Sequence, residues 1–282
     1  MRGLRVAALT SLALVAFTGN SLLCRIALKQ TQIDAASFTA IRLVSGALTL
    51  WLLGRARSNA PAGKGNWMSA LALFGYAAGF SFAYTTLTAA TGALLLFGAV
   101  QVTMIGWGVW AGERLTITQW LGLSLACVGL VGLSLPGVAA PSLVGAALML
   151  GAGVSWGAYS LRGKGAGNPM RVTGGNFLRA VPIALLWSAC TLDMASLDAT
   201  GTLYAVVSGA LTSGIGYAIW YMALPALRAT TAATVQLSVP VVAALGGVLF
   251  LGEAITWRTS LASIAILGGV ALVITTYASS DR

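Results

Sequence analysis

The sequence predicts an all-α integral membrane protein whose ten transmembrane helices form two inverted five-helix repeats. Three observations predict this fold class. Of the 282 residues, 58% are hydrophobic and only 8% are charged, whereas soluble domains carry about 25% charged residues. The apolar residues fall into ten segments of about 20 residues, the length that crosses a bilayer as a helix. The rarest residue types also recur at a nearly fixed offset along the chain.

The ten apolar segments follow one another with short connections. The first follows Arg2 and Arg5 and looks like a signal peptide, but polar residues at 18–21 interrupt it and no A-x-A cleavage site follows. We therefore expect it to remain as a helix. The longest connection, around 55–66, is too short for a further domain. The expected spans are 5–27, 34–54, 67–87, 92–111, 117–135, 142–161, 171–191, 202–223, 230–250 and 258–277.

The composition excludes several classes of function. The net charge is +10, but the basic residues stand one to three at a time between apolar runs, unlike the basic patch of a nucleic-acid binder. The chain has no His, and Cys24, Cys127 and Cys190 show no metal-ligand spacing. No GxxxxGK[ST] motif is present to bind ATP. We expect no catalytic residues, metal, cofactor or nucleic acid; the sequence leaves the oligomeric state open.

The distribution of Lys and Arg predicts the orientation in a bacterial-type inner membrane. With both termini in the cytoplasm, only Arg25, Lys29 and Arg258 fall outside, together with three aspartates. Basic residues favour the cytoplasmic side of short loops. Eleven cations then lie inside: Arg2, Arg5, Arg55, Arg57, Lys64, Arg114, Arg162, Lys164, Arg171, Arg228 and Arg282.

Rare residues reveal an internal repeat. The two Glu residues, Glu113 and Glu253, both follow Gly at the end of an apolar run and lie 140 residues apart. Two Arg residues lie near the centres of expected helices, Arg42 and Arg179, and they are 137 residues apart. An insertion of three residues near 222–230 reconciles the two offsets. We expect a first repeat over 1–137 and a second over 138–282.

Each repeat has five helices, so the second copy enters the membrane from the opposite side, as in secondary transporters. A Gly-Glu-x-x-Thr element reads GERLT at 112–116 and GEAIT at 252–256. On these features the chain resembles the EamA type of the drug/metabolite transporter superfamily, and most of all the YddG-type exporters of amino acids, including aromatic ones. The element itself has a structural reading, because Gly ends one helix and Thr116 with Gln119 has capping-box spacing for the next.

Two buried cations are the first candidates for substrate binding. An Arg near a helix centre costs about 2.5–3.5 kcal/mol to insert, so Arg42 and Arg179 require a reason. Either can hold a substrate carboxylate through charge-assisted hydrogen bonds. The alternative is structural: each caps carbonyl groups or reaches towards headgroups, and Pro182 frees the carbonyl of Leu178 beside Arg179. We expect one functional and one structural Arg, and the sequence does not say which.

Polar and aromatic side chains at mid-depth complete the predicted cavity. Pro240 kinks its helix beside Gln236 and Ser238, and Pro182 is the second candidate hinge. Asn20 and Gln101 are polar groups within apolar segments, which bind substrate or join helices. Aromatic walls with a few polar groups suit amphipathic metabolites, although ordinary core packing explains the same residues. The aromatic candidates are Tyr76, Phe80, Trp156, Tyr159 and Tyr217.

The resemblance and these residues together imply a secondary transporter that exports amino acids and related small metabolites by alternating access. No Asp, Glu or His lies near a helix centre, so we expect no titrating proton relay. A nucleotide-sugar or phosphorylated-metabolite carrier of the same superfamily is the alternative, and it would need several cations that converge on the cavity. An enzyme would need a nucleophile–base pair or paired carboxylates, which the sequence lacks.

Overall fold

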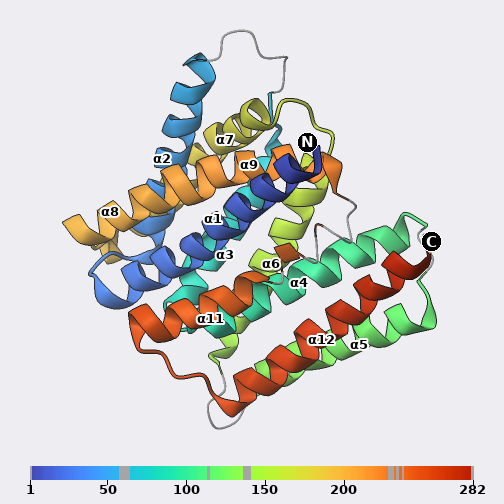
Figure 1. Ribbon diagram of the computed structural model, residues 1–282. Helices are drawn as coiled ribbons and strands as arrows, with labels where there is room; N and C mark the ends of the chain where they lie inside the picture. Colours follow the sequence, from blue (N-terminus) through green and yellow to red (C-terminus); the bar gives the residue numbers. More distant parts are fainter. Residues whose placement is uncertain are drawn as a thin grey trace.

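The computed structural model describes residues 2–56, 64–112, 115–135, 141–227, 232, 235–236 and 238–280. Within these residues the secondary structure is helical, with no strand. Figure 1 shows the long helices packed side by side as a bundle. Glu113 and Arg114 of the first Gly-Glu-x-x-Thr element lie outside the described residues.

The helices correspond closely to the expected segments. In chain order they are α1 (Arg2–Gln30), α2 (Ala35–Ala56), α3 (Trp67–Tyr84), α4 (Ala89–Trp110), α5 (Ile117–Ser134), α6 (Leu143–Gly163), α7 (Pro169–Cys190), α8 (Ala199–Val207), α9 (Gly216–Ala223), α11 (Ser238–Leu251) and α12 (Trp257–Ser280). Three short elements complete the path: the 3₁₀ turns η1 (Leu192–Met194) and η3 (Leu224–Ala226), and the π-helix η2 (Ser208–Ile215) between α8 and α9.

Length and apolar composition mark part of this bundle as membrane-spanning. Among the described residues, five helical stretches are long and apolar enough to cross a bilayer: Leu4–Gln30, Ala35–Arg55, Ala89–Trp110, Leu143–Gly163 and Ala199–Ala226. The apolar stretches Ile117–Leu133 and Ser238–Leu251 are shorter. Helix occurs within each of the ten expected ranges, and the ten-span count stays a prediction.

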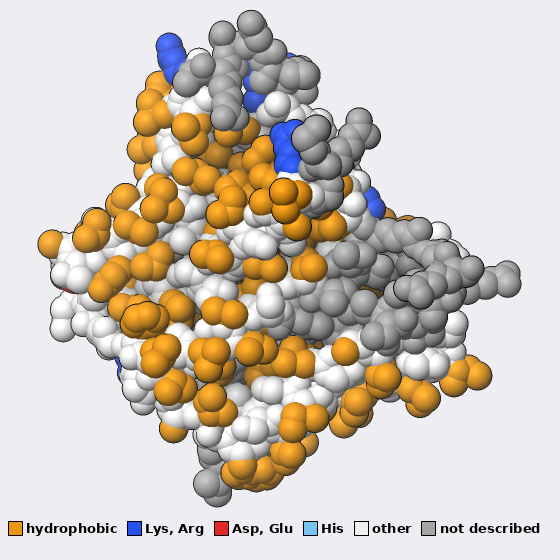
Figure 2. Space-filling view, in the orientation of Figure 1, with side chains coloured by type: hydrophobic (Ala, Val, Ile, Leu, Met, Phe, Trp, Pro, Cys, Tyr) orange, Lys and Arg blue, Asp and Glu red, His pale blue; other side chains and the backbone are white. Residues whose placement is uncertain are grey.

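The outer surface has the character expected of a protein in lipid. Large apolar side chains are exposed along several helices, among them Val15, Leu52, Val128 and Leu249. Figure 2 shows hydrophobic side chains across the visible face, with most of the visible Lys and Arg atoms near its upper edge. Lipid tails can solvate such an apolar face, whereas a soluble monomer rarely exposes so much of it.

The ends of the bundle are defined by two sets of contacts. At one end, which we call the basic end, Arg162 donates to Asn66 Oδ1 (3.1 Å) and Asn66 N donates to Asn176 Oδ1 (2.9 Å). At the other, the Asp34 end, Asp34 Oδ2 accepts from Ser196 N at 2.9 Å. The central part of α2 therefore lies between the two ends.

Both Gly-Glu-x-x-Thr elements end and start helices in the way the sequence predicts. Gly112 has φ +97° and Gly252 has φ +61°, which favours glycine at a helix end. Thr116 forms the predicted capping box with Gln119 at the start of α5. Thr256 Oγ1 accepts from Thr259 N (3.1 Å) at the start of α12. The Gly and Thr residues of the two elements therefore have structural roles.

Candidate functional site

Arg42 lies in the middle of α2, and its side chain is fully buried. Its Nε donates to Ser213 Oγ at 2.8 Å. Its Nη2 donates to Tyr217 Oη at 2.7 Å and to Tyr76 Oη at 3.3 Å. The guanidinium carbon also lies 5.1 Å from the centre of the Phe80 ring. One cation is thus held by neutral groups from α3, η2 and α9.

The close approach of α2 and η2 makes this arrangement possible. A Cβ at Gly209 would clash with the carbonyl oxygen of Arg42 and with Ser45 Oγ. Without that Cβ, the π-helix packs directly on α2 and presents Ser213 to the guanidinium. π-Helical turns are rare and are often found at functional sites.

Asn20 joins the same network from α1. Its Nδ2 donates to Tyr76 Oη at 2.9 Å. Its Oδ1 accepts from Ser208 Oγ at 2.8 Å, and the hydroxyls of Thr212 and Ser213 lie 3.4 Å away. Burial of an Asn side chain is tolerated here because both ends of its amide find partners. These hydrogen bonds join Asn20 and Arg42 to the side chains that they share. We call Asn20, Arg42, Tyr76, Ser208, Ser213 and Tyr217 the polar centre.

Aromatic rings enclose this polar centre. The Trp156 ring lies 4.6 Å from the Tyr217 ring and 4.9 Å from the Tyr76 ring, measured between centroids. Phe17 lies against Trp156 at 5.3 Å. Trp156 Nε1 donates to Gln236 Oε1 at 3.2 Å, which connects Gln236, shortly before α11, to the wall. Such rings combine apolar area with faces that attract cations.

The charge at the centre is not balanced. Arg42 Nη1 is buried without a hydrogen-bond partner. The described ion pair joins Arg25 to Glu253, and none of the hydrogen bonds to Arg42 comes from a carboxylate. A buried cation without an anion is strongly unfavourable. The site is therefore chemically suited to an anionic group that approaches Nη1.

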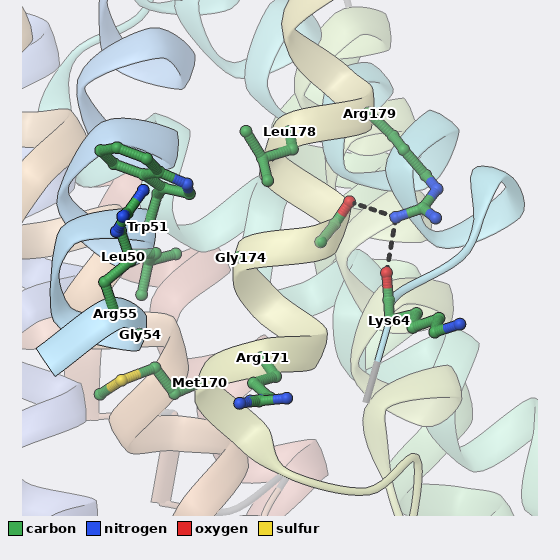
Figure 3. Close-up of a pocket in the computed structure, with 11 residues that line it drawn as sticks. Leu50, Trp51, Gly54, Arg55, Lys64, Met170, Arg171, Gly174, Leu178 and Arg179 are labelled. Atoms are coloured by element: carbon green, nitrogen blue, oxygen red, sulfur yellow. Dashed lines mark hydrogen bonds between the residues drawn. The ribbon is translucent and has the colours of Figure 1, made fainter. Parts of the chain in front are cut away.

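Arg179 has different surroundings. It is half-buried at the basic end, where its Nη1 donates to the carbonyl oxygens of Lys64 (2.5 Å) and Gly175 (2.9 Å). Figure 3 shows its side chain directed towards Lys64. Pro182 makes the Leu178 carbonyl an expected partner of Arg179. The carbonyls that Arg179 binds belong instead to Gly175 and Lys64. Arg179 therefore ties the α2–α3 connection to α7.

The remaining predicted residues make no hydrogen bond to Arg42. Tyr159 lies next to the centre, with its ring 5.6 Å from Trp156 and stacked on Tyr221 at 5.3 Å. Gln101 is buried in α4 and takes no part in the hydrogen bonds of Arg42. Ser238 is exposed and its hydroxyl donates to the carbonyl of Val235; its place in the cavity stays a prediction. Pro182 lies within α7 and Pro240 within α11; their hinge role stays a prediction.

Sequence reasoning missed several residues at the centre: Phe17, Ser208, Thr212 and Ser213. The three hydroxyl residues lie on η2, whose wider turns place them on a face that a regular helical period does not predict. Phe17 directly precedes the polar break at 18–21 in α1. That break is the signal that could have identified it.

A second buried charge cluster closes the Asp34 end. Arg25 Nε donates to Glu253 Oε1 at 2.8 Å, and Arg25 Nη1 donates to the Tyr84 carbonyl at 2.7 Å. Ala89 N donates to Glu253 Oε2 at 2.7 Å. We call these four residues the Arg25–Glu253 clasp. It connects α1, the α3–α4 turn and the α11–α12 turn.

Comparisons with known proteins identify the family. A model described as the EamA-like transporter family matches residues 143–275. An uncharacterized protein of Pseudomonas aeruginosa is 55% identical over 271 residues, which is 96% of this chain and 94% of that protein. The threonine/homoserine exporter RhtA of Salmonella typhimurium is 37% identical over 131 residues, but these cover only 44% of this chain and 43% of the exporter.

The fold is shared more widely than the sequence. One crystal structure matches with a TM-score of 0.65 at 18% identity, over 98% of this chain and 99% of the other. An uncharacterized transporter of Archaeoglobus fulgidus is 29% identical over 167 residues, 57% of this chain and 59% of that protein. The chain therefore belongs to the EamA-like transporter family of the drug/metabolite transporter superfamily, and it is a multi-pass inner-membrane transporter and not an enzyme.

Proposed function

We propose that this protein exports amino acids by alternating access and that Arg42 binds the substrate carboxylate. The observation that carries the proposal is the buried Nη1 of Arg42, which has no hydrogen-bond partner. A carboxylate that accepts from Nη1 would supply both the missing acceptor and the missing negative charge. The similarity to RhtA, named a threonine/homoserine exporter, supports an amino-acid substrate.

The groups around Arg42 also suit the ammonium end of an amino acid. The described residues at the centre offer no carboxylate to an ammonium group. They offer the ring faces of Tyr76, Trp156 and Tyr217, which lie within 4.6–6.2 Å of one another between centroids. Ring faces attract ammonium groups by cation–π interaction. The zwitterion then lies with its carboxylate on Arg42 and its ammonium group among the rings.

A phosphorylated metabolite fits this centre less well. A phosphate group carries about two negative charges and is usually bound by several cations or by a helix N-terminus. Arg42 is the cation among the central contacts, while the buried Arg25 is already paired with Glu253. This difference favours the amino-acid carrier over the nucleotide-sugar or sugar-phosphate carrier.

Two inverted repeats, 1–137 and 138–282, are part of the proposal, and the pattern of helix contacts supports them. If α6, α7, the α8–η2–α9 helix, α11 and α12 repeat α1 to α5, exchanging the copies should leave the contacts unchanged. α2 packs on α7, α4 on α11 and α5 on α12. Several further contacts have exchanged counterparts: α3–α6 with α1–α9, α4–α6 with α1–α11, and α3–α7 with α2–η2.

The same proposal includes aromatic substrates and a cytoplasmic location for both termini. Rings fill the centre, and the described cavities lie elsewhere. A substrate ring would pack against wall rings such as that of Trp156. Orientation rests on the basic residues of the basic end, which includes Arg55, Lys64 and Arg171, and which we place in the cytoplasm.

Counterflow in proteoliposomes tests the function. Vesicles loaded with unlabelled threonine should accumulate labelled threonine, homoserine or aromatic amino acids in a saturable way. A nucleotide-sugar and a sugar phosphate should not compete. Trp156→Ala should reduce flux of aromatic amino acids more than flux of threonine, since aromatic contacts are lost. Absence of saturable amino-acid counterflow, or competition by the sugar phosphate, would refute the proposal.

A further inference from the structure

A groove at the basic end has no role in the site described above. It has a volume of about 500 Å³ and is formed by the C-terminal part of α2, Lys64 and the N-terminal half of α7. Its lining includes Arg55, Arg171 and Arg179 and contains no acidic residue. Figure 3 shows Arg55 beside Trp51 on one side of α7 and Arg179 on the other. The groove thus combines an open mouth with positive charge.

The apolar part of the groove distinguishes its ligand from a soluble anion. Trp51 and Leu178 line it with side chains that are about half exposed. Leu185 lies two turns further along α7 and is equally exposed, so an apolar path leads from the cations along the helix. A phosphate with attached acyl chains matches this order of groups: charge at the helix end, then apolar surface.

We propose that this groove binds the headgroup phosphate of an anionic phospholipid, with an acyl chain along α7. Basic pockets between membrane helices attract anionic lipids, and each cation near the surface contributes about a fivefold gain in binding. Gly54 in the lining has open space where a side chain would stand, which leaves room there for the headgroup. The site depends on neither Arg42 nor the transported substrate.

Thermal unfolding in detergent tests the lipid site. Short-chain phosphatidylglycerol should raise the melting temperature, while short-chain phosphatidylcholine and inorganic phosphate should not. Arg171→Gln and Arg55→Gln should each shift the phosphatidylglycerol titration midpoint upward by about fivefold. Arg5→Gln, which removes an exposed cation from α1, is the matched control and should leave the midpoint unchanged. An equal effect of inorganic phosphate or phosphatidylcholine, or unchanged midpoints in both groove variants, would overturn the proposal.

The Arg25–Glu253 clasp carries a second, independent inference, which rests on the proposed alternating access. A short series of contacts leads from the centre to the clasp: Phe80 lies 5.1 Å from the Arg42 guanidinium and 4.7 Å from the Tyr84 ring. The Tyr84 carbonyl is bound by Arg25. The clasp therefore covers the centre at the Asp34 end.

The equivalent cation at the other end has neutral partners. Arg162 lies 137 residues after Arg25, the offset that also relates Arg42 to Arg179. It donates to Ser69 Oγ at 3.2 Å and to Asn66 Oδ1 at 3.1 Å. The two ends are therefore held by different interactions, with the buried ion pair at the Asp34 end.

We infer that the Arg25–Glu253 clasp closes the centre at the Asp34 end and breaks when the carrier opens there. A native thiol reports on this step. Cys24 is adjacent to Arg25 and is fully buried, so a water-soluble maleimide reaches it only when this end opens. In a Cys127→Ala, Cys190→Ser background, Cys24 is the remaining thiol.

Labelling rates decide the second inference. Arg25→Gln and Glu253→Gln should label Cys24 at least about tenfold faster, since a buried charge without its partner favours the open state. Arg162→Gln, the matched variant at the basic end, should not accelerate labelling. Unchanged labelling in both clasp variants, or equal acceleration by Arg162→Gln, would overturn the inference. The measurement needs no substrate, so it succeeds or fails separately from amino-acid transport.

Discussion

Arg42 and Arg179 occupy corresponding places in the two halves of the sequence, yet they have different surroundings. Arg42 is fully buried between neutral hydroxyl groups and retains an Nη1 without a hydrogen-bond partner. Arg179 is half-buried and binds two backbone carbonyls. A cation whose partners are carbonyls of its own protein stabilises the fold. A buried cation without an anion can gain one from a ligand, so the difference supports the proposed binding role of Arg42.

The largest expected effect separates the two arginines directly. Arg42→Lys keeps the charge but loses the planar guanidinium, so transport of free amino acids should fall about a hundredfold. Amino-acid amides lack the carboxylate and should be affected much less. Flux of both substrate classes in proteoliposomes measures this ratio. The assignment fails if the acid-to-amide ratio of Arg42→Lys equals that of the wild type, or if Arg179→Lys changes the ratio instead.

The second effect concerns a hydroxyl that positions Arg42. Tyr217→Phe removes a 2.7 Å hydrogen bond to Nη2, and we expect an approximately tenfold loss of amino-acid transport. Tyr221→Phe is the matched control, because its hydroxyl donates to the Tyr159 carbonyl and not to Arg42. Initial rates with equal protein incorporation measure both variants. Equal losses in the two variants would indicate general damage to the aromatic wall.

A smaller effect is expected from Arg179 at the basic end. Arg179→Gln loses the bonds to the Lys64 and Gly175 carbonyls, so the melting temperature in detergent should fall by about 2–4 °C. The acid-to-amide ratio of the folded variant should remain that of the wild type. A changed ratio with an unchanged melting temperature would reverse the roles of the two arginines.

The smallest effect is expected from pH. The sequence has no His, the side chain that titrates closest to neutral pH. Partial burial would raise the pKa of Asp34, but hydrogen bonds from Ser37, Ser196 and Ala36 hold it below its usual value. The backbone hydrogen bond from Gly201 lowers the pKa of Asp198. The stability that Asp34 contributes is thus present above the unfolded pKa and is lost only as pH falls through the lower folded pKa.

We therefore expect export to be unchanged when an imposed pH gradient is added at a fixed substrate gradient. Proteoliposomes with internal and external buffers between about pH 6 and pH 8 test this. A strong rise in export with the pH gradient would contradict an uncoupled carrier and would require a proton-binding group that the described centre does not contain.

The sequence predicts which large and polar residues lie near the polar centre better than it predicts the hydrogen bonds between them. Arg42, Asn20 and Trp156 are costly or large groups in apolar segments, so their convergence follows from the sequence pattern. Ser213 could not be predicted, because the π-helix changes which face of the segment a residue occupies. The depth of Ser238 in a kinked segment does not define the side of the helix on which it lies, so its hydrogen bond to the Val235 carbonyl could not be predicted. The hydrogen bonds of Arg179 depend on a loop contact that no local pattern encodes.

The fixed charge of Arg42 also has an electrical consequence. A positive site repels sodium or any other cation that would accompany the substrate, and the described centre offers no carboxylate to hold one. A zwitterion has no net charge, and Arg42 returns with the protein at the end of each cycle. Each turnover would then move no charge across the membrane, so voltage cannot set the direction of flux. In the cell, such a carrier would move amino acids from the side with the higher concentration to the side with the lower one, and it would export them when they accumulate in the cytoplasm.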